Sequence, residues 1–294
     1  MASRLTELLH RIDGESEIIL VNDGSTDASE KLINELAKKD PRIVGIHLSR
    51  NFGHQIAITA GMEQSRGDAI IIMDADLQDP PEVALDLIEK WKQGYDVVNA
   101  RRRIRKGESA LKKITASLFY RILSRMTDLD IPVDVGDFRL VDRKALSAFL
   151  QLKENNRFVR GMFSWIGFRQ TYVLFDRDSR HAGKTKYPFG KMLKLAVNGI
   201  LSFSDAPLRY VLNIGFLVSG ISFLAAITVV VIKILGVFSV PGWTSLVLIN
   251  ACLGGIQLVV VGVLGQYIAR IHEEVKGRPL YLVRAITTKD ARQK

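Results

Sequence analysis

The sequence predicts an α/β domain followed by a membrane-spanning hairpin of two helices. The 294-residue chain has a formal net charge of +10 and 24% charged residues, yet its mean hydropathy is positive, at +0.11. These values fit a chain in which a charged soluble part and a very apolar part are separate. Hydrophobic residues make up 47% of the chain, which excludes a disordered protein. The single cysteine, Cys252, excludes a disulfide framework and a cysteine-based zinc site.

Apolar runs and amphipathic segments alternate in the N-terminal part. We expect strands over 17–22, 42–48, 69–73 and 96–100, and helices over 27–39, 54–65 and 81–93. This alternation is typical of a mostly parallel sheet with helices on both faces. Ligands bind such sheets beyond the carboxyl ends of the strands, so residues at those ends are the first candidates for a site.

Two segments of the C-terminal part carry no charged residue, namely 210–232 and 234–269. A helix needs about 20 apolar residues to cross a bilayer, and Pro241-Gly242 marks a turn. These features predict a membrane-spanning hairpin over 208–270. The alternative is a hairpin buried in the core of a soluble protein. Basic residues flank both ends, so the positive-inside rule predicts a multi-pass inner-membrane protein whose N-terminal domain and both termini are cytoplasmic.

The positive charge is concentrated in three segments. Residues 101–125 hold nine basic residues and one acid, for a net charge of +8, and 177–194 and 270–294 are also strongly basic. These segments suit anionic lipid headgroups or phosphates. Nucleic acid is not expected, because no pattern of stacking aromatic residues accompanies the charges. We expect an interfacial amphipathic helix over 188–207 and a basic cytoplasmic tail over 271–294.

Acidic residues follow the predicted strands. Asp23 comes after the first strand, and Asp74 and Asp76 come after the third. Two carboxylates two residues apart at the end of a buried strand can share one Mg²⁺ or Mn²⁺ ion, which prefers oxygen ligands. Neither a G-x-G-x-x-G motif after the first strand nor a P-loop motif occurs, so the usual dinucleotide and P-loop sites are not indicated.

Five segments together resemble glycosyltransferase family 2, and more narrowly its polyprenyl-phosphate glycosyltransferases. They are VNDGSTD, LSRNFGHQIAITAG, DADLQDPPE, GDFRL and HAGKTKY. The resemblance implies a GT-A type nucleotide-sugar-binding domain over 1–187. It implies inverting transfer of a sugar from a nucleotide sugar, with UDP-glucose the first candidate, to undecaprenyl or another polyprenyl phosphate. The implied partners are this donor, this acceptor and membrane lipids, and a homo-oligomer is left open.

The resemblance also implies roles for individual residues. Asp74 and Asp76 would hold Mg²⁺ or Mn²⁺ on the donor diphosphate. Asp137, Asp76 and Arg139 would be catalytic, with Asp137 at the position of the family's proposed base, and we leave open whether it takes a proton or positions the attacking oxygen. The implied nucleotide-binding residues are Asp23, Asn51, Asp74 and Gln78. The implied acceptor-phosphate ligands are Arg101, Arg139, Arg180 and Lys186.

One departure from the family pattern concerns the N-terminal end. Family members usually begin with an apolar strand and a P-x-Y-N-E segment, whereas MASRLTELLH reads as the tail of the following helix. We therefore expect the sheet to lack its first strand, and a truncated, impaired lipid-binding homologue is one alternative. A processive polysaccharide synthase is disfavoured, because no tryptophan follows an arginine as in the Q-x-x-R-W motif of those enzymes.

Overall fold

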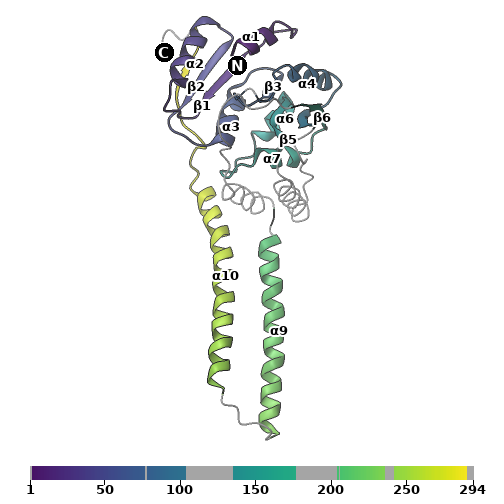
Figure 1. The fold of residues 1–294 in the computed structure, drawn as a ribbon, viewed down its shortest axis with the longest axis vertical. Helices are drawn as coiled ribbons and strands as arrows, with labels where there is room; N and C mark the ends of the chain where they lie inside the picture. Colours follow the sequence, from purple (N-terminus) through teal and green to yellow (C-terminus); the bar gives the residue numbers. More distant parts are fainter. Residues whose placement is uncertain are drawn as a thin grey trace. The chain divides into compact units, whose positions relative to one another are not determined.

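A computed structural model describes residues 2–76, 78–103, 135–176, 204, 206–235 and 242–289 (Figure 1). The chain forms two compact units. One consists of Met1–Gly199 with Arg278–Lys294, and the other of Ile200–Gly277. The C-terminal segment expected as a separate basic tail is therefore, from Arg278 onward, part of the N-terminal unit.

The first sheet has the strand order β1-β2-β7. Strand β1 (Ile18–Asn22) pairs in parallel with β2 (Ile43–Leu48), and β7 (Val283–Thr287) pairs antiparallel with the other edge of β2. The prediction of a cytoplasmic tail overlooked β7. Its five residues form a short strand whose backbone groups pair with the otherwise open edge of β2, and this long-range pairing leaves no signature in the local charge pattern.

The second sheet has the order β3-β5-β4-β6. Its strands are β3 (Ala69–Ile72), β5 (Val135–Asp142), β4 (Val97–Arg102) and β6 (Gln170–Phe175). Strand β5 is antiparallel to both neighbours, whereas β4 and β6 are parallel. The α/β class is confirmed, but the strand directions are mixed rather than mostly parallel. Apolar runs in the sequence indicate that a strand is buried, but they do not indicate whether it pairs parallel or antiparallel with its neighbours.

Helices cover both sheets. Helix α2 (Ser29–Lys39) packs on β1 and β2, α3 (His54–Gln64) packs on β1 and β3, and α4 (Val83–Lys92) packs on the second sheet. The remaining helices of this unit are α1 (Ala2–Leu9), α6 (Arg143–Phe149) and α7 (Val159–Trp165). The expected helices and strands between residues 17 and 102 are each found within two residues of the predicted bounds.

Among the described strands, β1 pairs only with β2 and β3 pairs only with β5. No backbone ladder in this part of the chain therefore joins the two sheets. Each sheet has its own buried cluster, with Ile18, Ala37 and Ile43 in the first and Val98 and Leu140 in the second. Helix α3 contacts β1 of the first sheet and β3 of the second (Figure 1).

The second unit contains two long apolar helices, α9 (Ala206–Ile234) and α10 (Trp243–Val275), of 29 and 33 residues. Their apolar stretches, Ala206–Ile232 and Cys252–Val275, are longer than the roughly 20 residues that a bilayer crossing needs. Neither stretch is buried inside the protein, which disfavours a soluble core hairpin and indicates membrane association. Most of the predicted interfacial helix over 188–207 lies outside the described residues.

Candidate active site

The loops after β1 and β2 are tied together by Asp23. Its carboxylate accepts hydrogen bonds from the backbone N–H groups of Phe52 at 2.7 Å and Gly53 at 2.9 Å. The backbone carbonyl oxygen of Asp23 accepts a third hydrogen bond, from Asn51 Nδ2 at 3.1 Å. The structure thus brings together Asp23 and Asn51, two of the four residues that the resemblance assigns to the nucleotide. A carboxylate offers about four acceptor positions, so these contacts leave room for a donor group of a ligand.

Asp74 and Asp76 follow β3, as expected. Asp76 Oδ1 accepts a hydrogen bond from the backbone N–H of Gln78 at 3.1 Å, and Asp74 Oδ1 lies 3.6 Å from Nε2 of His54. Within the described residues, no group of three or more His, Cys, Asp or Glu side chains is arranged to hold a metal ion through protein ligands alone. Two carboxylates fit an Mg²⁺ or Mn²⁺ ion that takes its other ligands from substrate phosphate and water.

Asp137, on β5, is contacted by the side chains of three residues in the described part of the chain. Arg160 on α7 donates to both of its oxygens, from Nε to Oδ1 at 2.9 Å and from Nη2 to Oδ2 at 3.1 Å. Two residues at the start of α3 add contacts to Oδ2, His54 Nε2 at 3.1 Å and Gln55 Nε2 at 3.4 Å. The side chain is 5% exposed. Asp137 therefore links β5 to both α3 and α7.

The charges around Asp137 keep it ionised. Burial alone would raise its pKa, but the hydrogen bond from His54 and the positive charge of Arg160 outweigh burial and hold the pKa well below its usual range. The same hydrogen bond raises the pKa of His54, against burial, with Asp74 adding to the rise. His54 thus contacts the predicted metal-binding carboxylate and the predicted base at once.

Arg139, on β5, is buried inside the protein. It is 1% exposed, and its guanidinium donates to the carbonyl oxygens of Gly136 at 2.9 Å and Asp137 at 3.4 Å. The guanidinium also lies 4.9 Å from the centre of the Phe163 ring. Burial lowers its pKa to about 10, with Asp137 opposing the shift, so Arg139 remains a cation at neutral pH. Arg139 is thus buried against protein carbonyl groups, and its predicted contact with the acceptor phosphate stays a prediction.

Arg101, near the end of β4, stays partly exposed, with its guanidinium 5.0 Å from the centre of the Tyr172 ring. An arginine on an aromatic face keeps its outer donors oriented and available in principle to an anion. The other two predicted acceptor ligands, Arg180 and Lys186, lie outside the described residues, so their roles stay predictions.

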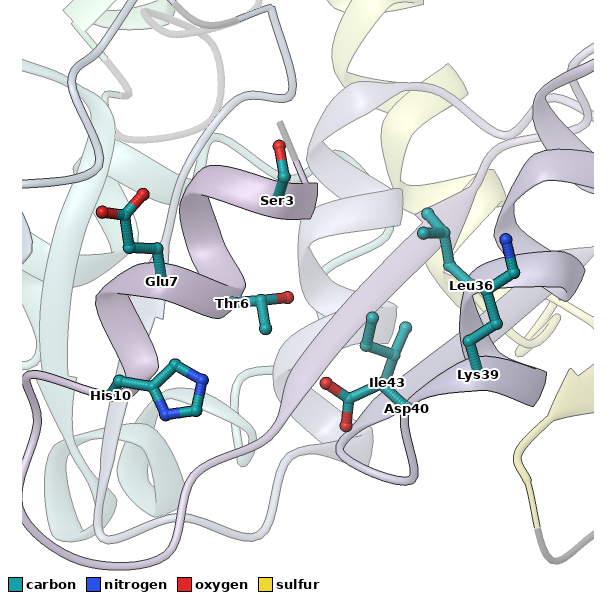
Figure 2. Close-up of a pocket in the computed structure, with 8 residues that line it drawn as sticks. All are labelled: Ser3, Thr6, Glu7, His10, Leu36, Lys39, Asp40 and Ile43. Atoms are coloured by element: carbon teal, nitrogen blue, oxygen red, sulfur yellow. The ribbon is translucent and has the colours of Figure 1, made fainter.

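A separate depression lies between α1 and the end of α2, with a volume of about 500 Å³ (Figure 2). Thr6 lines it from α1, His10 lines it from the turn that follows α1, and Lys39 lines it from α2. None of the predicted site residues is among those that line it, so we do not assign it to the active site.

Sequence reasoning missed three residues of the site, His54, Gln55 and Arg160. The first two stand in the LSRNFGHQIAITAG segment, directly after the strand-end loop of β2, and that position was a usable signal. Arg160 had no such signal. It belongs to a short helix far along the chain, and only folding brings it to Asp137.

Comparison with known proteins identifies the family. The profile described as "Glycosyl transferase family 2" matches residues 2–150. The chain belongs to glycosyl transferase family 2. This family 2 glycosyltransferase is 52% identical over 280 residues to an uncharacterized glycosyltransferase of Bacillus subtilis strain 168, covering 95% of this chain and 87% of that protein.

A second relative has a more specific name. The SfII prophage-derived bactoprenol glucosyl transferase of Shigella flexneri is 43% identical over 270 residues, which are 92% of this chain and 87% of that protein. Among solved structures, mannosyl-3-phosphoglycerate synthase from Rubrobacter xylanophilus gives a TM-score of 0.43 at 17% identity, over 72% of this chain and 69% of that chain. The predicted family and glycosyltransferase activity are confirmed.

Proposed function

We propose that this glycosyltransferase moves a sugar from a UDP-sugar to a polyprenyl phosphate at the membrane, with inversion at the anomeric carbon. Glucose is the first candidate for the sugar. The observation that carries the proposal is the set of contacts made by His54, which lies 3.6 Å from Asp74, 3.1 Å from Asp137 and directly after the Asp23-bound loop. His54 therefore connects the loop bound by Asp23, the predicted metal ligand Asp74 and the predicted catalytic residue Asp137.

The acceptor assignment is supported by the relatives and by the apolar helices. The bactoprenol glucosyl transferase of Shigella flexneri covers nearly the whole of this chain, including the helical hairpin. A lipid-linked acceptor also explains why the chain carries α9 and α10, which keep the enzyme where such an acceptor is dissolved. We propose that the N-terminal domain and both termini are cytoplasmic, following the basic residues that flank the hairpin.

Asp74 and Asp76 are the residues that would hold the divalent cation. When bound, the cation would neutralise charge on the departing nucleoside diphosphate. Asp23 and Asn51 would hold the nucleotide, with Gln78 near the diphosphate. Arg101 would help to hold the acceptor phosphate, together with Arg180 and Lys186.

The reaction needs little proton removal. An acceptor phosphate oxygen attacks the anomeric carbon, the bond from that carbon to the diphosphate breaks, and the diphosphate leaves with the electron pair. The phosphate is already anionic near neutral pH. Asp137, whose pKa is lowered and whose two oxygens are both engaged, is a weak base. We therefore favour positioning over proton abstraction as its role.

A transfer assay tests this function. Membranes that contain the full chain are supplied with undecaprenyl phosphate, Mn²⁺ and a panel of radiolabelled UDP-sugars, and lipid-linked label is measured. We expect product with at least one sugar, its loss on chelation, and recovery when Mn²⁺ or Mg²⁺ is restored. Asp76→Asn should reduce the rate about 100-fold or more, because a metal contact to the leaving group contributes several kcal/mol to the transition state.

Asp86→Asn is the matched control. It removes one carboxylate from an exposed position on α4, with no predicted ligand role, and should leave the rate unchanged. Label that enters only water-soluble product, or no product from any UDP-sugar, would contradict the proposed acceptor or donor.

The proposed orientation is tested by labelling Ser239→Cys, in a Cys252→Ser background, with a membrane-impermeant thiol reagent added to intact cells. We expect the reagent to modify the introduced cysteine in intact cells. A cysteine that the reagent does not modify there would contradict the proposed orientation.

A further inference from the structure

The two halves of the proposed site belong to different sheets. The nucleotide residues Asp23 and Asn51 follow β1 and β2 of the first sheet, whereas Asp74 and Asp76 follow β3 of the second. In the described part of the chain, no strand pairing spans the two sheets. A nucleoside diphosphate that binds both halves must nevertheless find them at a defined spacing, within the reach of one diphosphate.

Helix α3 is anchored to the first sheet. It packs along β1, and the position of Gly61 shows how closely, because a Cβ there would lie 3.1 Å from Cγ2 of Val21. The loop before α3 is held by the carboxylate of Asp23. The position of the first residues of α3 therefore determines the position of the nucleotide loops, by which we mean the loops after β1 and β2 that carry Asp23 and Asn51.

The same first residues of α3 are bound to the second sheet. His54 and Gln55 contact Oδ2 of Asp137 at 3.1 and 3.4 Å, and Gln55 Oε1 accepts a hydrogen bond from the backbone N–H of Val159 at 3.0 Å. Arg160, the next residue of α7, holds Asp137 from the other side through two hydrogen bonds. One buried carboxylate thus receives donors from both sides of the junction.

We propose that Asp137 is the anionic centre of a clamp, formed with His54, Gln55 and Arg160, that sets the spacing between the nucleotide loops and the Asp74–Asp76 pair. This inference rests on the proposed function. Asp137 is then a positioning residue, which acts through α3 rather than on the acceptor. Its four contacts engage both oxygens in fixed directions, as positioning requires and as proton abstraction does not.

The clamp predicts a specific split in ligand binding. UMP without metal needs only the nucleotide loops, whereas UDP with Mn²⁺ needs the loops and the Asp74–Asp76 pair at the correct spacing. Loss of the clamp should therefore leave UMP affinity within about twofold of wild type and weaken Mn²⁺·UDP affinity about tenfold or more, the order of coupling between contacting residues. Both affinities are measured by calorimetry on the full-length protein in detergent.

The variants are Asp137→Asn, Arg160→Met and the double variant. Because the two residues act as one unit, the double variant should bind Mn²⁺·UDP no more weakly than the weaker single variant. Gln55→Met removes two cross-sheet hydrogen bonds without altering a charge, and should show the same split to a smaller extent. It covers the case in which Asp137→Asn fails to fold.

The chain offers a matched control pair, Asp40 and Arg42. Arg42 binds Asp40 as Arg160 binds Asp137, with Nε to Oδ1 at 3.0 Å and Nη2 to Oδ2 at 2.7 Å, but this pair lies before β2 and away from the site. Asp40→Asn, Arg42→Met and their double variant should bind both ligands as wild type does.

Three outcomes would overturn the clamp. Loss of transfer by Asp137→Asn with both affinities unchanged would indicate a proton acceptor. A parallel loss of UMP and Mn²⁺·UDP would indicate general damage to the fold, and additive losses in the double variant would show that the residues do not act together. Measurements on the wild-type protein distinguish these results from a failure of the proposed function. If the wild-type protein binds neither UMP nor Mn²⁺·UDP, the proposed donor is wrong, whatever the variants do.

Discussion

Replacing Gly24 by alanine should damage the nucleotide loops through a backbone contact. Gly24 has a φ of +63°, and a Cβ there would lie 2.5 Å from the carbonyl carbon of Arg50 and 2.5 Å from the backbone nitrogen of Asn51. The left-handed conformation costs alanine about 1–2 kcal/mol. Because the obstructing atoms are backbone, the loop must move, and overpacking of this kind costs about 1–3 kcal/mol more. The total expected loss of unfolding free energy is about 2–5 kcal/mol.

Gly14→Ala separates the two contributions. Gly14 also has a positive φ, +98°, but no atom lies within 4 Å of the position its Cβ would take. This control should lose only the backbone part and keep wild-type nucleotide affinity, whereas Gly24→Ala should also lose at least about tenfold in UMP affinity, equivalent to about 1.4 kcal/mol. Thermal unfolding and calorimetry measure the two quantities. The reasoning is refuted if Gly24→Ala matches Gly14→Ala in both measurements.

Two further predictions concern the supporting structure. Trp91→Phe removes the 2.7 Å hydrogen bond from Nε1 to Asp142 Oδ2 and should cost about 1.5–3 kcal/mol in thermal unfolding, as expected for a bond to a charged group. Trp165→Phe, at a residue that is 60% exposed, should change stability by less than about 0.5 kcal/mol, and equal losses would contradict the assignment. Burial, and then the hydrogen bond to Glu63, raises the pKa of Tyr281. Above the ordinary tyrosine pKa of about 10 the unfolded chain therefore loses this proton before the folded one, so stability should fall as pH rises, and less steeply in Tyr281→Phe. Identical slopes in alkaline unfolding would exclude this contribution.

Some of the site could be predicted from the sequence because strand ends are local features. The apolar runs before Asp23 and Asp74 identify buried strands, and the carboxyl ends of such strands are where ligands bind in α/β sheets. Each of these residues is found beyond the strand end where it was expected. Their predicted contacts with substrate await the experiments above.

Other features could not be read from any local pattern. Nothing in the local sequence around Arg139 indicates that its side chain is buried against Phe163. Strand β7 looks like part of a charged tail, yet it pairs with β2 across more than two hundred residues of sequence. In both cases, partners that are distant in the sequence provide the energy that outweighs the local preference.

Composition and local pattern were enough for the α/β class, the apolar hairpin and the order of acidic loops, because periodicity and charge separation depend only on neighbouring residues. The family came from the resemblance of five motif segments. The direction of β5, the burial of Arg139 and the meeting of His54 with Asp74 and Asp137 came only from tertiary structure. Each depends on which distant segments pack together, and the low dielectric of the interior then decides which charges are held in place.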